Sequence, residues 1–453
     1  MPHKSELNAD ACMEWARDAC RAATADGADQ AEAFIQSERI ITVTVENNQL
    51  RSSEEKEDPG FCLRAIKKGA TGYARGMGVD ADTVRASGAQ AAAMAAAAEP
   101  DPRFDTLPGP APIPAVAGLF DEAVAALSSA DVIPWAAQCM DAARQAHPHV
   151  ALKMDITIVS GWTAIVNSLG VAVSQPHTFA SVAVFPIIRQ GDEAGSYYDY
   201  TAARRLADLL DHCELTARTT RKAASFLGAK KIQSGTMPVI LGPMATASFL
   251  GSVCGAADGE SVLRGRSFLS GKKGADIAPA LLSVTETPLA EAGLNSEAFD
   301  AEGCARADRA LIQSGRLTGY LHNATTAAQA GEPLTGHAQR SGYLSGVGIG
   351  LTNLVCAPGQ ATEQELIGNV KNGLYIDMGS LSPNMVSGAV SGTVDVGYII
   401  ENGAFAAPVS NAMVGGDIFA LLKSIQAVSS DGRAMPGNFM PSLLLGGVAV
   451  AGS

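Results

Sequence analysis

Hydrophobic positions in the first part of the chain follow two different periods. Apolar residues recur at helical intervals over residues 9–25, and Gly27 follows them as a helix-terminating glycine. From residue 30 the period becomes two, with β-branched runs, an Asn47-Asn48 turn and a return strand over residues 61–67. The pattern predicts a helix that packs on an antiparallel meander.

The pattern continues with alternating helical and extended blocks up to residue 227. Residues 79–99 are alanine-rich and helical, whereas the proline-rich stretch 100–114 predicts an extended crossover. Helices are predicted over 115–128 and 133–146, paired strands over 150–200, and a long helix over 201–227.

Beyond residue 231 the chain becomes glycine-rich, with short strand-like segments bounded by Gly, Asn and Pro. They include "MPVILG", "RALIQSGRLTGYL", "NGLYIDM" and "SLLLGGVAVAG". Such regular short strands are typical of a β-sandwich or barrel. We therefore expect an α+β fold with two domains. Residues 1–230 form a helix and antiparallel-sheet domain that contains the 100–114 crossover, and residues 231–453 form a β-rich domain.

Composition agrees with a folded protein and argues against nucleic-acid binding. The chain has 453 residues, of which 47% are hydrophobic and 17% charged, with a formal net charge of −13. An acidic surface repels phosphate backbones. The basic residues between positions 204 and 231 are spaced as on a helix, so we interpret them as a solvated helix face; they are Arg204, Arg205, Arg218, Arg221, Lys222, Lys230 and Lys231.

The N-terminal sequence "MPHKSELNADACMEW" lacks the apolar run of a secretory signal, and no window reaches about 18 consecutive apolar residues. We therefore expect a cytoplasmic protein. Its eight cysteines are isolated, which is typical of buried small hydrophobes in that compartment.

Motifs for nucleotide or metal chemistry are missing from the sequence. No Walker-type phosphate loop occurs, and "GVGIG" at residues 346–350 lacks the following helix of a dinucleotide fold. Among the histidines only His147 and His149 are close in sequence, in a "HPH" segment that is typical of a helix-ending turn. His322 and His337 lie near Glu332 in the β-rich half without forming a known motif.

Several long segments together resemble one protein family. They are "PVILGPMATASFLGSVCGAADGESVLRGRSFLSGKKG", "SGRLTGYLHNATTAAQAG", "VKNGLYIDMGSLSPNMVSGAVSGTVDVGYIIENGAFAAPVSNAMVGG", and, earlier, "SERIITVTVENNQLRSSEEKEDPGFCLRAIKKGATGYA". They are similar to the TldD/PmbA family over nearly the whole chain. The resemblance implies a metallopeptidase-like fold.

In that family the TldD-type chain carries His-Glu-x-x-x-His on a helix, which holds zinc and supplies a general base, and a cysteine near the C-terminus completes the site. On this chain the three motif positions fall at Gly251, Ser252 and Ala256, and the late cysteine falls near Ser430 or Asp431. None of these residues supplies an imidazole or a thiolate, and Cys254 on the same segment is interpreted as a buried structural residue. We therefore expect this chain to have no catalytic and no metal-binding residues of the family's kind.

The resemblance implies a TldE-type subunit that is not catalytic alone. It would pair with a TldD-type chain in a zinc metallopeptidase that degrades unfolded peptides or matures ribosomally made peptide precursors. This chain would bind no cofactor, and the zinc would lie in the partner. Two alternatives stay open, namely a homodimeric hydrolase that uses His322, His337 or Cys254, and a stand-alone module that binds peptides at a strand edge.

Overall fold

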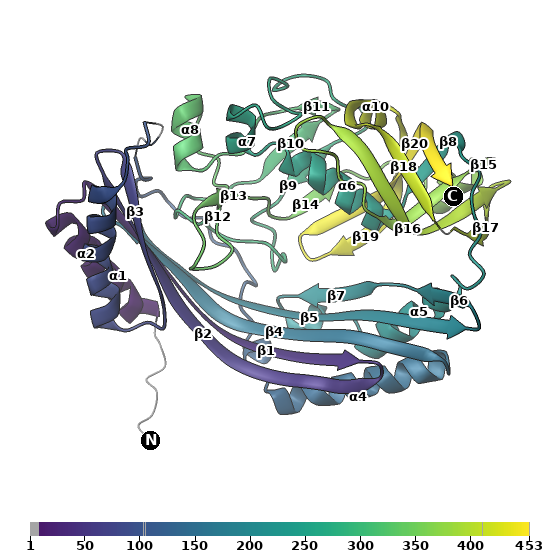
Figure 1. Cartoon of the computed structure of the whole chain (residues 1–453), viewed down its shortest axis with the longest axis horizontal. Helices are drawn as coiled ribbons and strands as arrows, with labels where there is room; N and C mark the ends of the chain where they lie inside the picture. The colour runs from purple at the N-terminus through teal and green to yellow at the C-terminus, as the bar shows by residue number, and fades with distance from the viewer. Residues whose placement is uncertain (1–8, 103, 105, 410, 453) are drawn as a thin grey trace.

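The computed structural model describes residues 9–102, 104, 106–409 and 411–452. Residues 1–8, which include His3 and the first part of the N-terminal segment discussed above, lie outside this range, as do 103, 105, 410 and 453. Two β-sheets face each other, and helices cover the outer side of the first one (Figure 1). The combination confirms the predicted α+β class.

The first sheet has seven strands in the order β3-β2-β1-β4-β5-β6, with β7 paired to β5. All of its pairings are antiparallel. Its strands are β1 (Gln30–Glu46), β2 (Gln49–Lys67), β3 (Ala70–Met77), β4 (Val150–Asn167), β5 (Ala172–Gln190), β6 (Glu193–Ser196) and β7 (Asp199–Ala203). The helices of this half are α1 (Ala9–Ala25), α2 (Ala81–Ala97), α3 (Glu122–Ala125), α4 (Ser129–Ala146) and α5 (His212–Ala224).

Local sequence signals set most of these elements. The first helix has its predicted bounds, and the Asn47-Asn48 turn has the positive φ angles of 51° and 59° that asparagine tolerates. Alternate side chains of β1 then point to opposite faces. Ala33, Ile35, Ile41 and Val43 share one face, on which the first two join the core under α1 and α2 and the last two join the core under α4 and α5. The opposite face of the sheet stays turned toward the C-terminal half (Figure 1).

Two predicted helices are wrong in extent. The segment predicted as a helix over 115–128 contains only α3, because Gly118 takes a left-handed φ of 74° and the Ala292 N–H binds the Ala117 carbonyl. The segment 201–227 begins with strand β7 and a short 3₁₀ turn over residues 206–208 before α5 starts at His212. Pairing of β7 with β5 overrides the helical period there.

The second sheet contains eleven strands, of which five close into a barrel-like ring. The ring runs β8-β15-β16-β18-β20 and closes because β20 also pairs with β8. Its strands are β8 (Gly235–Leu241), β15 (Asn372–Gly379), β16 (Ala389–Glu401), β18 (Ala412–Asp417) and β20 (Asn438–Gly452). The predicted barrel-like, β-rich second half is confirmed.

The remaining elements of this half extend the ring or lie beside it. The other strands are β9 (Val284–Glu286), β10 (Arg309–Gln313), β11 (Arg316–Leu317), β12 (Ala338–Gln339), β13 (Gly348–Ile349), β14 (Leu354–Cys356), β17 (Ala404–Pro408) and β19 (Ile425–Met435). The helices are α6 (Pro243–Gly255), α7 (Gly259–Leu263), α8 (Ala324–Ala330), α9 (Glu363–Gly368) and α10 (Ile418–Lys423). Among the described residues, no helix is both long and apolar enough to cross a membrane.

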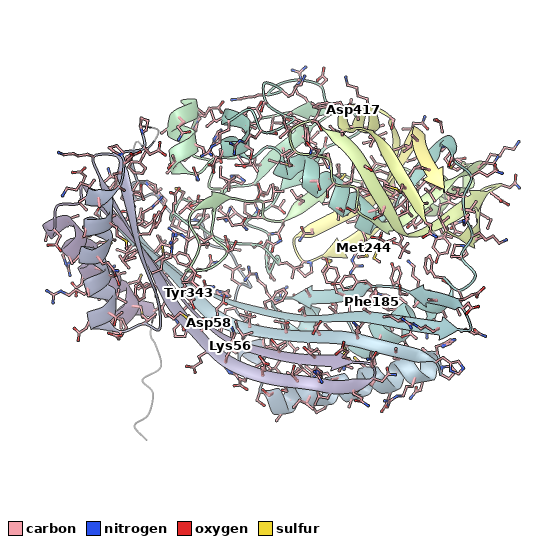
Figure 2. The ribbon with its side chains drawn as sticks, viewed as in Figure 1. Lys56, Asp58, Phe185, Met244, Tyr343 and Asp417 are labelled. Atoms are coloured by element: carbon pink, nitrogen blue, oxygen red, sulfur yellow. The ribbon has the colours of Figure 1, made fainter. Side chains whose placement is uncertain are left out.

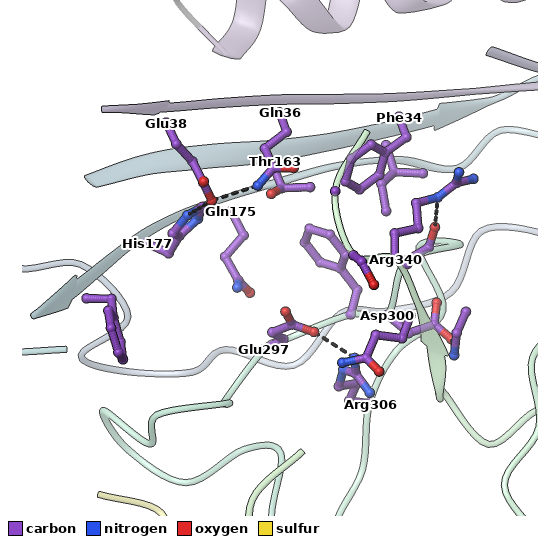
Figure 3. A pocket seen from close by; sticks show the side chains of 18 of the residues that line it. Phe34, Gln36, Glu38, Thr163, Gln175, His177, Glu297, Asp300, Arg306 and Arg340 are labelled. Atoms are coloured by element: carbon purple, nitrogen blue, oxygen red, sulfur yellow. Dashed lines mark hydrogen bonds and ion pairs between the residues drawn. The ribbon is translucent and has the colours of Figure 1, made fainter. Parts of the chain in front are cut away.

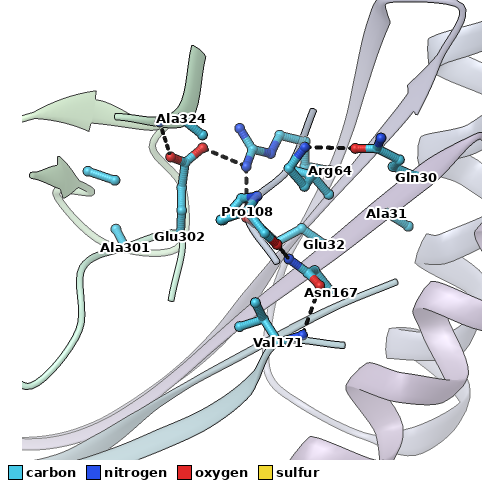
Figure 4. A network of polar contacts seen from close by, with 12 residues as sticks. Gln30, Ala31, Glu32, Arg64, Pro108, Asn167, Val171, Ala301, Glu302 and Ala324 are labelled. Atoms are coloured by element: carbon cyan, nitrogen blue, oxygen red, sulfur yellow. Dashed lines mark hydrogen bonds and ion pairs between the residues drawn. The ribbon is translucent and has the colours of Figure 1, made fainter. Parts of the chain in front are cut away.

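A buried ion network joins the two halves (Figure 4). The Arg64 guanidinium on β2 contacts Glu32 on β1 at 2.7 Å and Glu302 from the C-terminal half at 2.8 Å. Arg340, also from the C-terminal half, contacts the second oxygen of Glu32 at 2.6 Å. These side chains are all at least 95% buried. Charges removed from water need such partners, so the network fixes the contact between the halves.

Candidate functional site

Helix α6 carries the three positions that the family resemblance assigns to zinc binding. Gly242 is its N-cap residue and Pro243 opens its first turn, a position that proline favours. One face of the helix packs into the C-terminal core through Phe249, Leu250 and Val253. The other face is only partly buried and consists mainly of small residues.

The structure places the three motif positions in different surroundings. Gly251 is half-buried, and a Cβ added to it would meet no atom within 4 Å. The Ser252 hydroxyl donates to the Ser248 carbonyl at 2.8 Å and lies 3.0 Å from the Ser382 hydroxyl. Ala256 ends the helix and is completely buried in the core. Two positions thus lie on the partly exposed face, while the third is enclosed.

The late-cysteine region lies on β19, next to the first turn of α6. The Ser430 N–H donates to the Ala361 carbonyl, and an Asp431 carboxylate oxygen accepts the Glu363 N–H at 2.7 Å. Asp431 lines a cavity of about 360 Å³ between the two halves, together with Met244 of α6. Figure 2 shows Met244 on the side of α6 that faces the first sheet. Gly251, Ser252 and Ala256 are not among the described residues that line this cavity.

The walls of this cavity between the halves carry paired charges. The Lys222 ammonium contacts Asp377 and lies 2.9 Å from the Tyr197 hydroxyl, which itself donates to Asp377 at 2.9 Å. Burial, with the neighbouring Asp377 carboxylate, raises the pKa of Tyr197 far above its usual range. Tyr375 is likewise buried, its pKa is raised, and it donates to Glu363 at 2.9 Å. Both phenols therefore stay neutral donors.

A further contact ties β19 to the first sheet beside this cavity. The Arg433 guanidinium binds the Asp199 carboxylate at 2.7 Å and the Tyr200 carbonyl at 2.7 Å, and it lies over the Tyr200 ring. Charged groups here pair with each other across the gap, which is the arrangement of a rigid interface.

No local pattern in the sequence indicates this cluster, and one of its members belongs to the basic residues expected on a solvated helix face. The ammonium of that residue, Lys222, contacts Asp377 in the cavity wall. Arg204, from the same basic group, is buried and binds the carbonyls of Gly293 and Ser296. The solvated-face interpretation is therefore wrong for Arg204, whereas the Lys222 side chain is 35% exposed and also pairs with Asp377. Only contacts between distant segments reveal their roles.

His322 and His337 hold buried positions near each other. His322 is fully buried, its Nδ1 lies 3.2 Å from the Thr326 hydroxyl, and burial lowers its pKa. His337 binds the Glu286 carboxylate through Nε2 at 2.5 Å and the Thr335 hydroxyl through Nδ1 at 2.9 Å. The Thr335 hydroxyl in turn donates to the His322 carbonyl at 2.9 Å, so its proton is engaged. These bonds fix a buried loop.

Cys254 is 2% exposed, and burial raises its pKa far above its usual value. A thiolate is needed for attack or for metal binding, so this thiol is chemically inert at neutral pH. Seven of the described cysteines are buried, and all eight are free thiols. Within the residues that the structure describes, no three His, Cys, Asp or Glu side chains gather as a metal site would require.

Zinc does not fit the residues at the aligned positions. Protein zinc sites use imidazole nitrogen, thiolate sulfur or carboxylate oxygen. Gly251 and Ala256 offer none of these, and the Ser252 hydroxyl is hydrogen-bonded within the chain.

Comparisons with known proteins agree with this architecture. Three family models match the chain: PmbA/TldA metallopeptidase domain 1 over residues 31–98, the central domain over 122–227 and the C-terminal domain over 234–452. A metalloprotease of Methanothermobacter thermautotrophicus is 29% identical over 288 residues, which cover 60% of each chain. Metalloprotease PmbA of Escherichia coli O157:H7 is 27% identical over 63% of this chain and 61% of its own length. The chain thus matches about three fifths of the length of these curated relatives.

Among solved structures, TldE from Thermococcus kodakarensis superposes with a TM-score of 0.88 at 22% identity and covers 97% of this chain and 100% of its own. That likeness shows a shared fold. Together with the three family models, which span both halves, it establishes that the chain belongs to the PmbA/TldD metallopeptidase family.

Proposed function

We propose that this chain is a TldE-type subunit that performs no peptide cleavage itself and completes a cytoplasmic heterodimer with a zinc-bearing TldD-type chain. The observation that carries the proposal is the chemistry of α6. By the family resemblance, Gly251, Ser252 and Ala256 correspond to the positions where the family's catalytic chains have two imidazoles and a carboxylate.

The surroundings of these positions support the same proposal. Ala256 is fully enclosed, so the side chain at this position reaches neither solvent nor substrate. Cys254, on the same helix, points into the core with a raised pKa. The likeness in fold to TldE of Thermococcus kodakarensis supports assignment to the TldE type.

In this proposal the substrates are unfolded peptides or ribosomally made precursor peptides, and the partner supplies the zinc. In the proposed heterodimer, this chain forms part of the wall of the enclosed space between the subunits. Charge pairs at the junction of its own two halves, such as Lys222 with Asp377, hold the halves in a fixed arrangement.

The test is to purify the chain alone and together with a TldD-type chain of the same organism that has an intact His-Glu-x-x-x-His. We expect the two chains to co-purify, zinc to follow the partner, and cleavage of an unfolded peptide to require the partner. About one zinc per chain in the isolated protein, lost when His322 or His337 is replaced, would favour the homodimeric hydrolase instead. Failure of the two chains to associate at micromolar concentration would contradict the partner role.

A further inference from the structure

A second cavity lies inside this chain, between the inner face of the first sheet and two loops of the C-terminal half (Figure 3). Its volume is about 400 Å³, within the range of small-ligand sites. The floor comes from β1, β4 and β5, and the roof comes from residues 294–306 and 338–342. We call it the sheet–loop cavity. It does not include α6 or any aligned zinc position.

Strand register arranges the floor in rows. In one row Glu38, Gly161 and His177 lie side by side on β1, β4 and β5. A Cβ at Gly161 would lie 2.3 Å from the Ser37 carbonyl, so only glycine fits there. Without a side chain between them, the Glu38 carboxylate and the His177 Nε2 meet at 2.9 Å.

The next row offers groups that complement a peptide bond. It consists of Gln36, Thr163 and Gln175. The Gln36 amide nitrogen donates to Glu38 at 2.6 Å, and the Gln175 carbonyl accepts the Ala298 N–H at 2.8 Å. These bonds leave a carbonyl acceptor on Gln36 and an amide donor on Gln175. A ligand amide presents the matching donor and acceptor.

The end of the cavity beyond this row is apolar. Phe34 and Ile165 are neighbours on β1 and β4, and Phe299 from the roof packs in the same buried cluster. Transfer of an apolar side chain from water to such a surface lowers the free energy.

The roof holds an acid and a base in direct contact. Arg306 donates to the Glu297 carboxylate at 2.6 Å and to the Gly336 carbonyl at 2.7 Å. The Arg306 side chain is 4% exposed, and its Nε–H has no acceptor among the described residues. Glu297 is 45% exposed, so its carboxylate is accessible. A ligand with an ammonium next to a carbonyl oxygen satisfies both groups.

The accessible charge in the cavity is therefore acidic. Glu297 and Glu38 keep 45% and 22% of their side-chain surface, whereas Arg306 and Arg340 keep 4% and 1%. The guanidiniums stabilise the loops, and the carboxylates remain open to a ligand. A cation is favoured over an anion at this surface.

We propose that the sheet–loop cavity binds the free amino-terminal end of a peptide. The ammonium pairs with Glu297, the first carbonyl oxygen faces Arg306, the following amide lies against Gln36 and Gln175, and an apolar side chain enters the end formed by Phe34 and Phe299. This chain would thus recognise peptide amino termini itself, at a site separate from any cleavage in a partner.

The test is calorimetric titration of the isolated full chain with the dipeptide amide Leu-Phe-NH₂ and, separately, with N-acetyl-Leu-Phe-NH₂. We expect the free amine to bind and the acetylated peptide to bind at least about tenfold more weakly, since a charge-assisted hydrogen bond is lost. Equal binding of the two peptides, or no binding of the free amine at about 10 mM, would overturn the proposal.

Variants localise the site. Glu297→Gln and Gln175→Leu should each weaken binding of Leu-Phe-NH₂ about tenfold. Glu401→Gln, at an exposed position on β16, is the matched control and should leave it unchanged. Unchanged affinity in both cavity variants would contradict the placement. If a variant fails to fold, the difference in affinity of the unaltered chain for the free and the acetylated peptide still tests the proposal. Because no partner is present, this result is independent of whether the chain associates with a TldD-type chain.

Discussion

Restoring the zinc motif on α6 is expected to fail, and the most costly position is Ala256. Replacing Gly251 by His, Ser252 by Glu and Ala256 by His rebuilds His-Glu-x-x-x-His in sequence. Gly251→His meets open space and removes a helical glycine, which is worth up to about 1 kcal/mol. Ser252→Glu loses the bonds to Ser248 and Ser382, at a cost of about 0.5–1.5 kcal/mol.

Ala256→His is the costly change. The residue is 0% exposed and lies in the core cluster of the C-terminal half. An imidazole there overpacks the core, at about 1–3 kcal/mol, and buries ring nitrogens without partners, at about another 1–3 kcal/mol. We therefore expect Ala256→His alone to lower the free energy of unfolding by roughly 2–6 kcal/mol.

Urea denaturation followed by circular dichroism measures this cost, with Gly251→His as the matched control that should stay near the unaltered protein. The triple variant should bind no stoichiometric zinc and cleave no unfolded peptide, because its second imidazole is enclosed and no thiolate follows on β19. An Ala256→His variant as stable as the parent, or a triple variant that holds one zinc and turns over peptide, would refute this reasoning.

Other expectations concern the buried charges and thiols. Arg64→Met removes one partner from each of two buried carboxylates, so it should destabilise the chain by about 3–5 kcal/mol. Glu302→Gln should cost less, because the amide can still bond to Arg64. Urea denaturation midpoints compare the two variants, and equal losses of stability would contradict the ion-pair argument. Burial holds the pKa of His322 below its ordinary 6.5, so the unfolded chain binds the proton first and stability should fall as pH drops below about 6.5; His322→Gln should flatten that part of the pH profile of the urea midpoint, and an unchanged profile would count against it. Cys254 should not react with a thiol reagent in the native state at pH 7.5 and should react after denaturation, which mass spectrometry detects. Rapid labelling of the native protein at Cys254 would show that this thiol is accessible to solvent.

The sequence by itself determined the elements whose signals are local. The helix over Ala9–Ala25, the Asn47-Asn48 turn and the long antiparallel strands follow from hydrophobic period and turn chemistry, which act between near neighbours. The chemistry offered by α6 is also a property of sequence, since no folding gives Gly251 or Ala256 a metal-binding group.

The tertiary structure alone decided what depends on contacts between distant segments. Residues 201–203 have a helical period in sequence but form β7, because β5 offers a strand partner. The ring closes only when β20 pairs with β8, about two hundred residues earlier. Glu297 and Gln36 meet in one cavity for the same reason. The hydrophobic period shows on which face of its own helix or strand a side chain lies. Which other element packs against that face depends on contacts between distant segments, and no local sequence pattern specifies it.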